Sequence, residues 1–180
     1  PYLKVVNYST NYRKSMKLFR IIMLVILLSF SNIFAQKIDT VYISSDTLKI
    51  RQISLTTPWL YHSGDDSSWS KIDYNDSDWD TLNSVIFSDE ISPEKWTGIG
   101  WFRKKIKLDS LLINKSIAIR IFHYGASEIF WNGKLVQSNG TVGSDTSSEK
   151  NYQPNNIPFV INLDSTLINT IAIRYSNHKS

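Results

Sequence analysis

Two acidic clusters, each closed by a tryptophan, are the part of this sequence whose residue types and spacing come closest to a ligand site. They are Asp65-Asp66-Ser67-Ser68-Trp69 and Asp76-Ser77-Asp78-Trp79. Asp73, Asn75 and Asp76 carry side-chain oxygens of the kind that coordinate calcium, and the D-x-N-x-S spacing from Asp73 resembles the opening of an EF-hand loop. The pattern then fails, because Asp78 stands where that loop needs glycine and Ser84 where a bidentate glutamate should close it.

The other interpretation of these clusters is structural. Asp and Ser side chains accept backbone hydrogen bonds in Asx-turns and cap single helical turns. The tryptophan after each cluster then turns inward and covers the core. We expect this role for both clusters, and a loose calcium site through Asp73, Asn75 and Asp76 is the alternative.

No catalytic set can be assembled from the other side chains. His62, His123 and His178 are scattered, and the chain contains no HExxH spacing, GxSxG elbow, phosphate-binding glycine loop or dinucleotide fingerprint. No pair of carboxylates is marked out by its surroundings as acid and base. Cysteine is absent, which excludes disulfides and thiolate metal sites. We therefore predict no enzymatic activity and no cofactor for this chain.

Aromatic side chains offer the remaining chemistry, since flat rings can stack on sugars while also filling a core. Trp96 is the first candidate for ligand contact, because it lies in a glycine-flanked loop where its ring can stay exposed. Tyr124 and Trp131 are the further candidates. Trp79 and Trp101 lie within tighter motifs and should be buried.

The elements that must position these groups are β-strands. Apolar and polar residues alternate in short runs, and no amphipathic helix of useful length appears after Gln36. Asn132-Gly133 is a strong hairpin signal. The long segments 63–95 and 140–156 read as irregular. The pattern predicts an all-β sandwich, with strands at 40–44, 48–55, 58–62, 101–108, 116–122, 127–132, 134–137, 158–163 and 170–175.

The N-terminal region has the layout of a secretory signal peptide. Lys17 and Arg20 precede an apolar run from Ile21 to Leu28, and Ala35 is the expected last residue before cleavage. A retained anchor is the alternative, although the strictly apolar run is shorter than the ~20 residues that span a bilayer comfortably. The prediction is export to the periplasm or cell envelope.

Four regions are expected along the chain. Residues 1–15 should be non-structural sequence upstream of Met16, 16–35 the signal peptide, 36–56 either N-terminal strands or a lead-in segment, and 57–180 a β-sandwich truncated at its C-terminus. All 16 acidic residues follow Gln36, whereas five of the 20 basic residues precede it, which leaves 15 basic residues and a net charge of −1. The sequence has no basic patch to suggest a nucleic-acid partner.

Four pieces in a fixed order carry a family resemblance. They are the Asp/Trp clusters, GIGWFRKKIKL at 98–108, GASEIFWNGKLV at 125–136 and NTIAIRYSN at 169–177. Together they resemble the galactose-binding-like jelly roll, a β-sandwich that forms the N-terminal sugar-binding domain of β-galactosidase and β-glucuronidase glycoside hydrolases. The resemblance covers about residues 57–177, so the sandwich expected at 57–180 should be of the galactose-binding-like type. It implies fold-defining roles for Asp76, Trp79, Gly98, Gly100, Trp101, Arg103, Gly125, Asn132 and Gly133.

The same module also resembles the periplasmic N-terminal domains of bacterial membrane sensors of the histidine kinase type. The segment NGTVGSDTSSEKNYQP (139–154) departs from the hydrolase pattern. The first expectation is therefore an extracytoplasmic sensory module of a membrane signalling protein, tied to the membrane through a downstream region. The alternatives are the non-catalytic sugar-binding domain of an exported glycoside hydrolase and a structural module without ligand. A carbohydrate or another small molecule is the expected partner.

Overall fold

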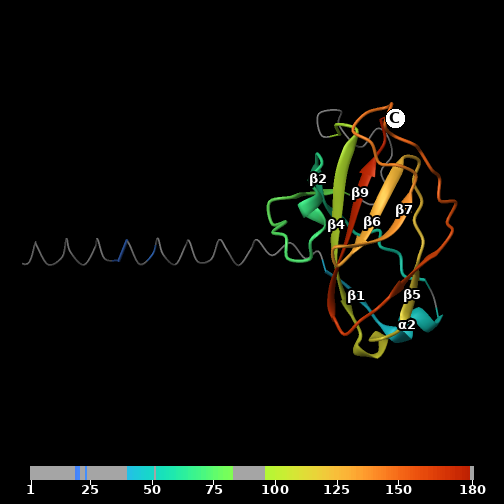
Figure 1. Ribbon diagram of the computed structural model, residues 1–180. Helices are drawn as coiled ribbons and strands as arrows, with labels where there is room; N and C mark the ends of the chain where they lie inside the picture. The colour runs from blue at the N-terminus through green and yellow to red at the C-terminus, as the bar shows by residue number, and fades with distance from the viewer. Residues whose placement is uncertain (1–18, 21–22, 24–39, 51, 83–95, 179–180) are drawn as a thin grey trace, which may run out of the picture. The chain divides into compact units, whose positions relative to one another are not determined.

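The computed structural model describes residues 19–20, 23, 40–50, 52–82 and 96–178 (Figure 1). Phe19, Arg20 and Met23 are helical, and the rest of the predicted signal peptide lies outside the described residues. No helix within these ranges is long and apolar enough to cross a membrane. The fold below is that of residues 39–180, which form a unit separate from residues 1–38.

Strands make up most of the regular structure in this unit, which confirms the predicted all-β class. The strands are β1 (Thr40–Ile43), β2 (Trp59–Ser63), β3 (Asp80–Leu82), β4 (Ile99–Leu108), β5 (Ser116–Ile119), β6 (Ala126–Trp131), β7 (Lys134–Asn139), β8 (Phe159–Asn162) and β9 (Ile168–Ser176). The helical elements are α2 (Ser45–Ile50) and the 3-10 turns η1 (Ser67–Ser70) and η2 (Ser110–Leu112).

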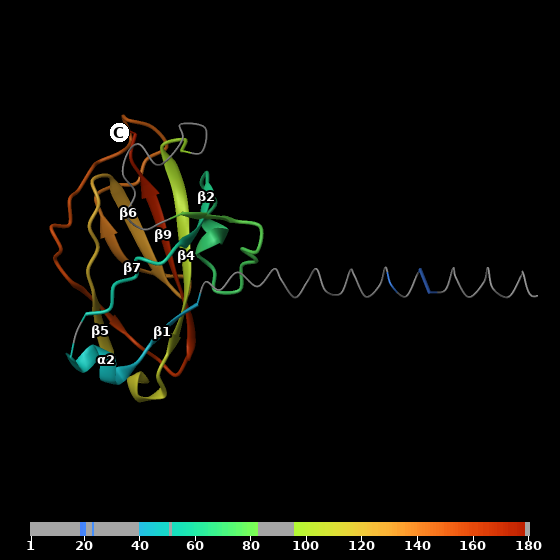
Figure 2. The ribbon, with the colours of Figure 1, turned by 180° about the vertical axis from the view of Figure 1, so that it is seen from behind.

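The strands form two sheets. The large sheet has the order β3-β2-β4-β9-β6-β7, and β1 also joins β4; β5 and β8 pair with each other in the second sheet. Figures 1 and 2 show β4, β9, β6 and β7 side by side from opposite directions. Within the described strands every pairing is antiparallel except that of β1 with β4. One edge of β4 pairs with β2 along residues 100–103 and with β1 along residues 105–108.

The main core lies between the two sheets. Because strand side chains alternate between faces, one side of the large sheet sends its apolar residues inward. Phe102, Ile106, Ile129 and Ile171 from that side pack in one cluster with Ile161 of β8. Each such side chain contributes roughly 1.5–3 kcal/mol when it leaves water, so the second sheet is held to the first mainly by this layer.

A smaller apolar cluster covers the outer face of the large sheet, which we define as the face turned away from β5 and β8. Segment 64–79 folds over this face and brings Trp69 and Trp79 onto Leu60, Trp101 and Ala172. Trp79 and Trp101 are 2% and 1% exposed, so their predicted burial is confirmed. The tryptophans of the two acidic clusters therefore cover a core, as the structural interpretation expects.

The predicted strand at 48–55 is wrong in its first half. Residues 45–50 form α2 instead, because the Asp109 carboxylate accepts hydrogen bonds from the backbone N–H and hydroxyl of Ser45, at 3.2 and 2.8 Å, and holds the first turn. Ile53 and Leu55 then pack against the main core from an irregular segment. The alternation of apolar and polar residues, which suggested a strand, arises because every second side chain of this segment is partly buried, although the segment pairs with no strand that the structure describes.

The predicted hairpin is confirmed. Asn132 and Gly133 connect β6 to β7 with φ angles of 51° and 81°, the positive values that a tight two-residue turn requires. The Asn132 side chain also accepts a hydrogen bond from the N–H of Thr170 at 2.9 Å and donates to Asn169 at 2.7 Å. The turn is thus fixed both by its backbone geometry and by side-chain bonds to β9.

Candidate ligand-binding cleft

The second acidic cluster is part of the fold rather than a free set of ligands. The Asp76 carboxylate accepts a hydrogen bond at 2.8 Å from Nε of Arg103, whose side chain is completely buried. The Arg103 guanidinium also donates to the backbone carbonyls of Trp69 and Lys71 and lies 5.8 Å from the ring of Trp79. Because the outer-face core surrounds this ion pair, Asp76 holds segment 64–79 to the sheet.

This arrangement does not support the calcium alternative. One Asp76 oxygen is bonded to Arg103, and the other lies 3.8 Å from the ammonium group of Lys105. Asn75 accepts a hydrogen bond from the N–H of Ser77 at 3.3 Å in an Asx-turn. Across the part of the chain that the structure describes, Asp73 included, no three His, Cys, Asp or Glu side chains come together in a way that could hold a metal ion.

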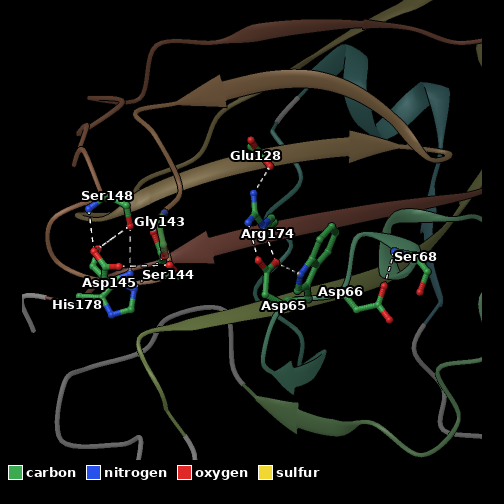
Figure 3. A network of polar contacts seen from close by, with 12 residues as sticks. Asp65, Asp66, Ser68, Glu128, Gly143, Ser144, Asp145, Ser148, Arg174 and His178 are labelled. Carbon is green, nitrogen blue, oxygen red and sulfur yellow. Dashed lines mark hydrogen bonds and ion pairs between the residues drawn. The ribbon is translucent and has the colours of Figure 1, made fainter.

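The first acidic cluster splits between two roles. Asp66 caps η1, since its carboxylate accepts the N–H of Ser68 at 2.8 Å. That bond also lowers the pKa of Asp66. Asp65 instead turns toward the sheet and meets Arg174 of β9 (Figure 3). One residue therefore caps a helical turn, and its neighbour takes part in a charged group on the outer face.

Arg174 is the centre of this charged group. Its Nε and Nη2 donate to the two oxygens of Asp65 at 2.7 and 2.6 Å, and its Nη1 donates to Glu128 at 3.0 Å. Trp101 adds a hydrogen bond from its indole N–H to Asp65 at 3.3 Å. Figure 3 shows Arg174 between the two carboxylates. A bidentate pair of this kind has a fixed direction as well as charge.

Strand register explains how these groups meet. Trp101 of β4 pairs with Arg174 of β9, which pairs in turn with Glu128 of β6. Residues opposite one another on adjacent strands share a face, so the three side chains form a row across the sheet. η1 lies beside this row, and the loop that precedes it supplies Asp65.

The row borders a cleft of about 350 Å³ on the outer face, which we call the Arg174 cleft. Its lining residues are Asp65, Ser67, Ser70, Trp101, Glu128, Phe130 and Arg174. Phe130 is partly exposed and stacks on Trp101, with ring centroids 5.4 Å apart and planes 28° from parallel. An aromatic surface beside carboxylate and hydroxyl groups is chemistry that suits a sugar, which has both C–H faces and hydroxyls.

The electrostatics keep the cleft charged at neutral pH. The hydrogen bond from Arg174 lowers the pKa of Asp65, against an opposing effect of burial. The same bond raises the pKa of Arg174 above its usual value. Asp65 is therefore an ionised acceptor at neutral pH and has no proton to donate to a leaving group.

The three aromatic residues predicted to touch a ligand are not in this cleft. Trp131 is only 5% exposed and belongs to the main core, so its predicted ligand contact is wrong. Trp96 is half-buried, with its indole N–H donating to the carbonyl of Asn177 at 3.2 Å and its ring 5.6 Å from that of Tyr175. The expected exposed face of Trp96 is therefore largely covered. Tyr124 is 64% exposed, and its contact with a ligand stays a prediction.

Sequence reasoning did not single out Glu128, Phe130 or Arg174. Glu128 and Phe130 flank buried Ile129 in the alternating run of β6, which places them on one face. That signal gives the face of each strand but not which strands are neighbours. Asp65 was visible in the acidic cluster, although its partner Arg174 lies 109 residues further along the chain.

A second polar network holds the loop after β7 (Figure 3). Asp145 accepts hydrogen bonds from the backbone N–H groups of Ser147 and Ser148, both at 2.9 Å, and from both hydroxyls. These bonds lower the pKa of Asp145 well below its usual range. His178 donates from Nε2 to the carbonyl of Gly143 at 2.9 Å. The network orders the predicted irregular segment 140–156, and its polar atoms bond within the loop or to the end of β9.

Comparisons with known proteins support the predicted fold. The chain resembles the structure of a β-glucuronidase from glycoside hydrolase family 2 (TM-score 0.53, 18% identity, covering 72% of this chain and 15% of that one). It also resembles a Bacteroides uniformis β-glucuronidase (TM-score 0.52, 19% identity, covering 71% of this chain and 15% of that one). A third similar structure is a family 2 glycosyl hydrolase from Bacteroides cellulosilyticus (TM-score 0.50, 23% identity, covering 73% of this chain and 18% of that one). No family model and no curated protein sequence matches the chain.

These likenesses show the fold, which is that of a galactose-binding-like β-sandwich. The chain spans less than a fifth of the length of each hydrolase named here. The shared part is therefore one module of much longer enzymes.

Proposed function

We propose that this chain is a non-catalytic carbohydrate-binding domain of the kind carried by exported glycoside hydrolases, and that the sugar binds in the Arg174 cleft. The observation that carries the proposal is the placement of Phe130 beside Asp65, Glu128 and Arg174 on one sheet face. A sugar ring can rest on the phenyl group while its hydroxyls meet the charged groups. The fold shared with family 2 hydrolases supports the same class of ligand.

The comparisons favour this reading over the sensory module that we first expected. The similar structures reported above are glycoside hydrolases. Within the described residues we find no feature that favours a signalling role. The third interpretation, a structural module without a ligand, applies if no sugar binds to the chain.

The chemistry of the cleft also favours binding over hydrolysis. A glycosidase needs one carboxyl group that donates a proton and a second that acts as base or nucleophile. Asp65 and Glu128 both bond to the same guanidinium, and Asp65 has a lowered pKa. We therefore expect the isolated chain to bind sugars without turning them over. Steady release of nitrophenol from nitrophenyl glycosides by repurified protein would contradict this.

The test is a sugar titration of the chain from residue 36 onward, followed by amide chemical shifts and by tryptophan fluorescence, to which Trp101 in the cleft contributes with the five other tryptophans. Neutral hexosides and oligosaccharides are the probes. Phe130→Ala should weaken binding by about two- to tenfold, because one stacked aromatic contact is worth roughly 0.5–1.5 kcal/mol. Val160→Ala is the control, since Val160 is 61% exposed on β8 of the second sheet and does not line the cleft.

Two results would count against the proposal. If the parent chain binds no probe, the domain is a structural module. If it binds but Phe130→Ala and Val160→Ala bind equally well, the site lies elsewhere, and exposed Tyr124 becomes the first candidate. Thermal melting of both variants identifies any loss of binding that comes from unfolding.

A further inference from the structure

We infer that the Arg174 cleft selects neutral sugars and excludes sugars that carry a carboxylate or sulfate. This inference rests on the proposed function and adds the charge class of the ligand. It follows from the net charge of the cleft and from the hydrogen bonds that its side chains already make. It also follows from the pairing of Arg103 and Lys105, the next basic residues on the same face of β4, with Asp76.

The charges lining the cleft do not cancel. Asp65 and Glu128 are negative, Arg174 is the one positive side chain among the lining residues, and the group has a net charge of −1. Asp66, which caps η1, adds a further carboxylate next to Asp65, and its charge is partly offset by Lys71. An anionic ligand entering the cleft therefore meets excess negative charge at close range, where screening by salt is incomplete.

The hydrogen bonds in the cleft favour a ligand that donates. Three of the five N–H groups of the Arg174 guanidinium, one on each nitrogen, already donate to a carboxylate. In contrast, one Glu128 oxygen accepts from Arg174, and the other accepts no hydrogen bond from the residues that the structure describes. Sugar hydroxyls can donate to this oxygen, whereas a uronate or sulfate group brings only acceptors.

The next basic residues of β4 on the outer face are already close to a carboxylate. The next residue of β4 on the outer face is Arg103, which is bonded to Asp76 and fully buried. The Lys105 ammonium lies 3.8 Å from that same carboxylate. An anion that paired with Arg174 as closely as the two carboxylates do would have to displace Asp65 or Glu128, and that would break bonds holding η1 and β6 to β9.

Matched sugars test the inference directly. The probes are methyl hexopyranosides in the gluco, galacto and manno series, the corresponding uronates, and the methyl esters of those uronates, which keep the shape and remove the charge. We expect each neutral hexoside and ester that binds to do so at least tenfold more tightly than its uronate at low salt. The gap should narrow as salt is raised.

Two variants separate local charge from overall charge. Glu128→Gln removes one negative charge from the cleft and should reduce the preference for ester over uronate several-fold. Asp46→Asn removes the same charge from α2, at the other end of β4 from Trp101, where the Asp46 side chain is 83% exposed, and should leave the preference unchanged.

The outcomes keep this inference distinct from the proposed function. If uronates bind as tightly as their esters, or more tightly, the charge selection is wrong while sugar binding stands. If Asp46→Asn changes the preference as much as Glu128→Gln, the selection does not arise in this cleft. If no probe binds at all, the proposed function fails and this inference fails with it.

Discussion

At the scale of single residues, the buried pair between Asp76 and Arg103 should be the most sensitive point of the fold. Asp76→Ala leaves the guanidinium of Arg103 buried without its counter-ion, which typically costs about 3–5 kcal/mol. Urea unfolding of the two proteins measures the difference. The double variant Asp76→Ala with Arg103→Met should recover part of the loss, because it removes the stranded charge. Equal stability of Asp76→Ala and the parent would mean that the pair does not hold segment 64–79.

His123 should make the domain sensitive to mild acid. Burial lowers its pKa from 6.5 to about 4. Between those two pH values the unfolded chain binds a proton that the folded chain excludes, so stability falls as pH drops from about 6.5 to about 4 and this loss ends below that range. Urea unfolding across this range should show a flatter profile for His123→Gln than for the parent. Parallel profiles would indicate that His123 titrates normally in the folded protein.

At the scale of elements, the hairpin between β6 and β7 gives a test of backbone conformation alone. A side chain at Gly133 has room, since a Cβ placed there would have as its nearest neighbours the carbonyl oxygen of Ser70 at 3.6 Å and Cα of Lys71 at 3.7 Å. The φ of 81° is nevertheless unfavourable for a β-branched residue. Gly133→Val should cost about 1–3 kcal/mol. Gly133→Asn is the control and should cost less, because Asn tolerates positive φ. Equal melting temperatures of the parent and both variants would contradict the positive φ at residue 133.

Local patterns predicted the elements better than their arrangement. Asn132-Gly133 predicts its turn because only the two residues themselves decide it. The start of α2 could not be read locally, since the carboxylate that holds it lies at Asp109, 64 residues away. The cleft is harder still: Trp101, Glu128 and Arg174 meet only when β4, β9 and β6 are placed side by side in one register. Strand order is a long-range property that periodicity does not encode.

At the scale of the whole molecule, the sandwich extends further toward the N-terminus than we expected from the family resemblance, which begins near residue 57. β1 pairs with β4, and Ile43 is 6% exposed in the main core. Ile43→Ala should therefore cost about 2–5 kcal/mol in urea unfolding. Tyr42→Ala is the neighbouring control, because Tyr42 is 57% exposed and should change stability little. Similar small effects of both variants would restrict the domain to the later strands.

The position of β9 in the large sheet has a consequence for the order in which the chain can fold. β9 is the last strand of the described chain, yet it lies between β4 and β6. A chain leaving the ribosome thus has β4 and β6 with no shared neighbour until residues 168–176 emerge, and the unpaired edges of both strands are open to other chains during that time. Folding dominated by such distant contacts is slow. Assembly of the sheet, and of the cleft that depends on Arg174, must therefore wait until residues 168–176 have been synthesised.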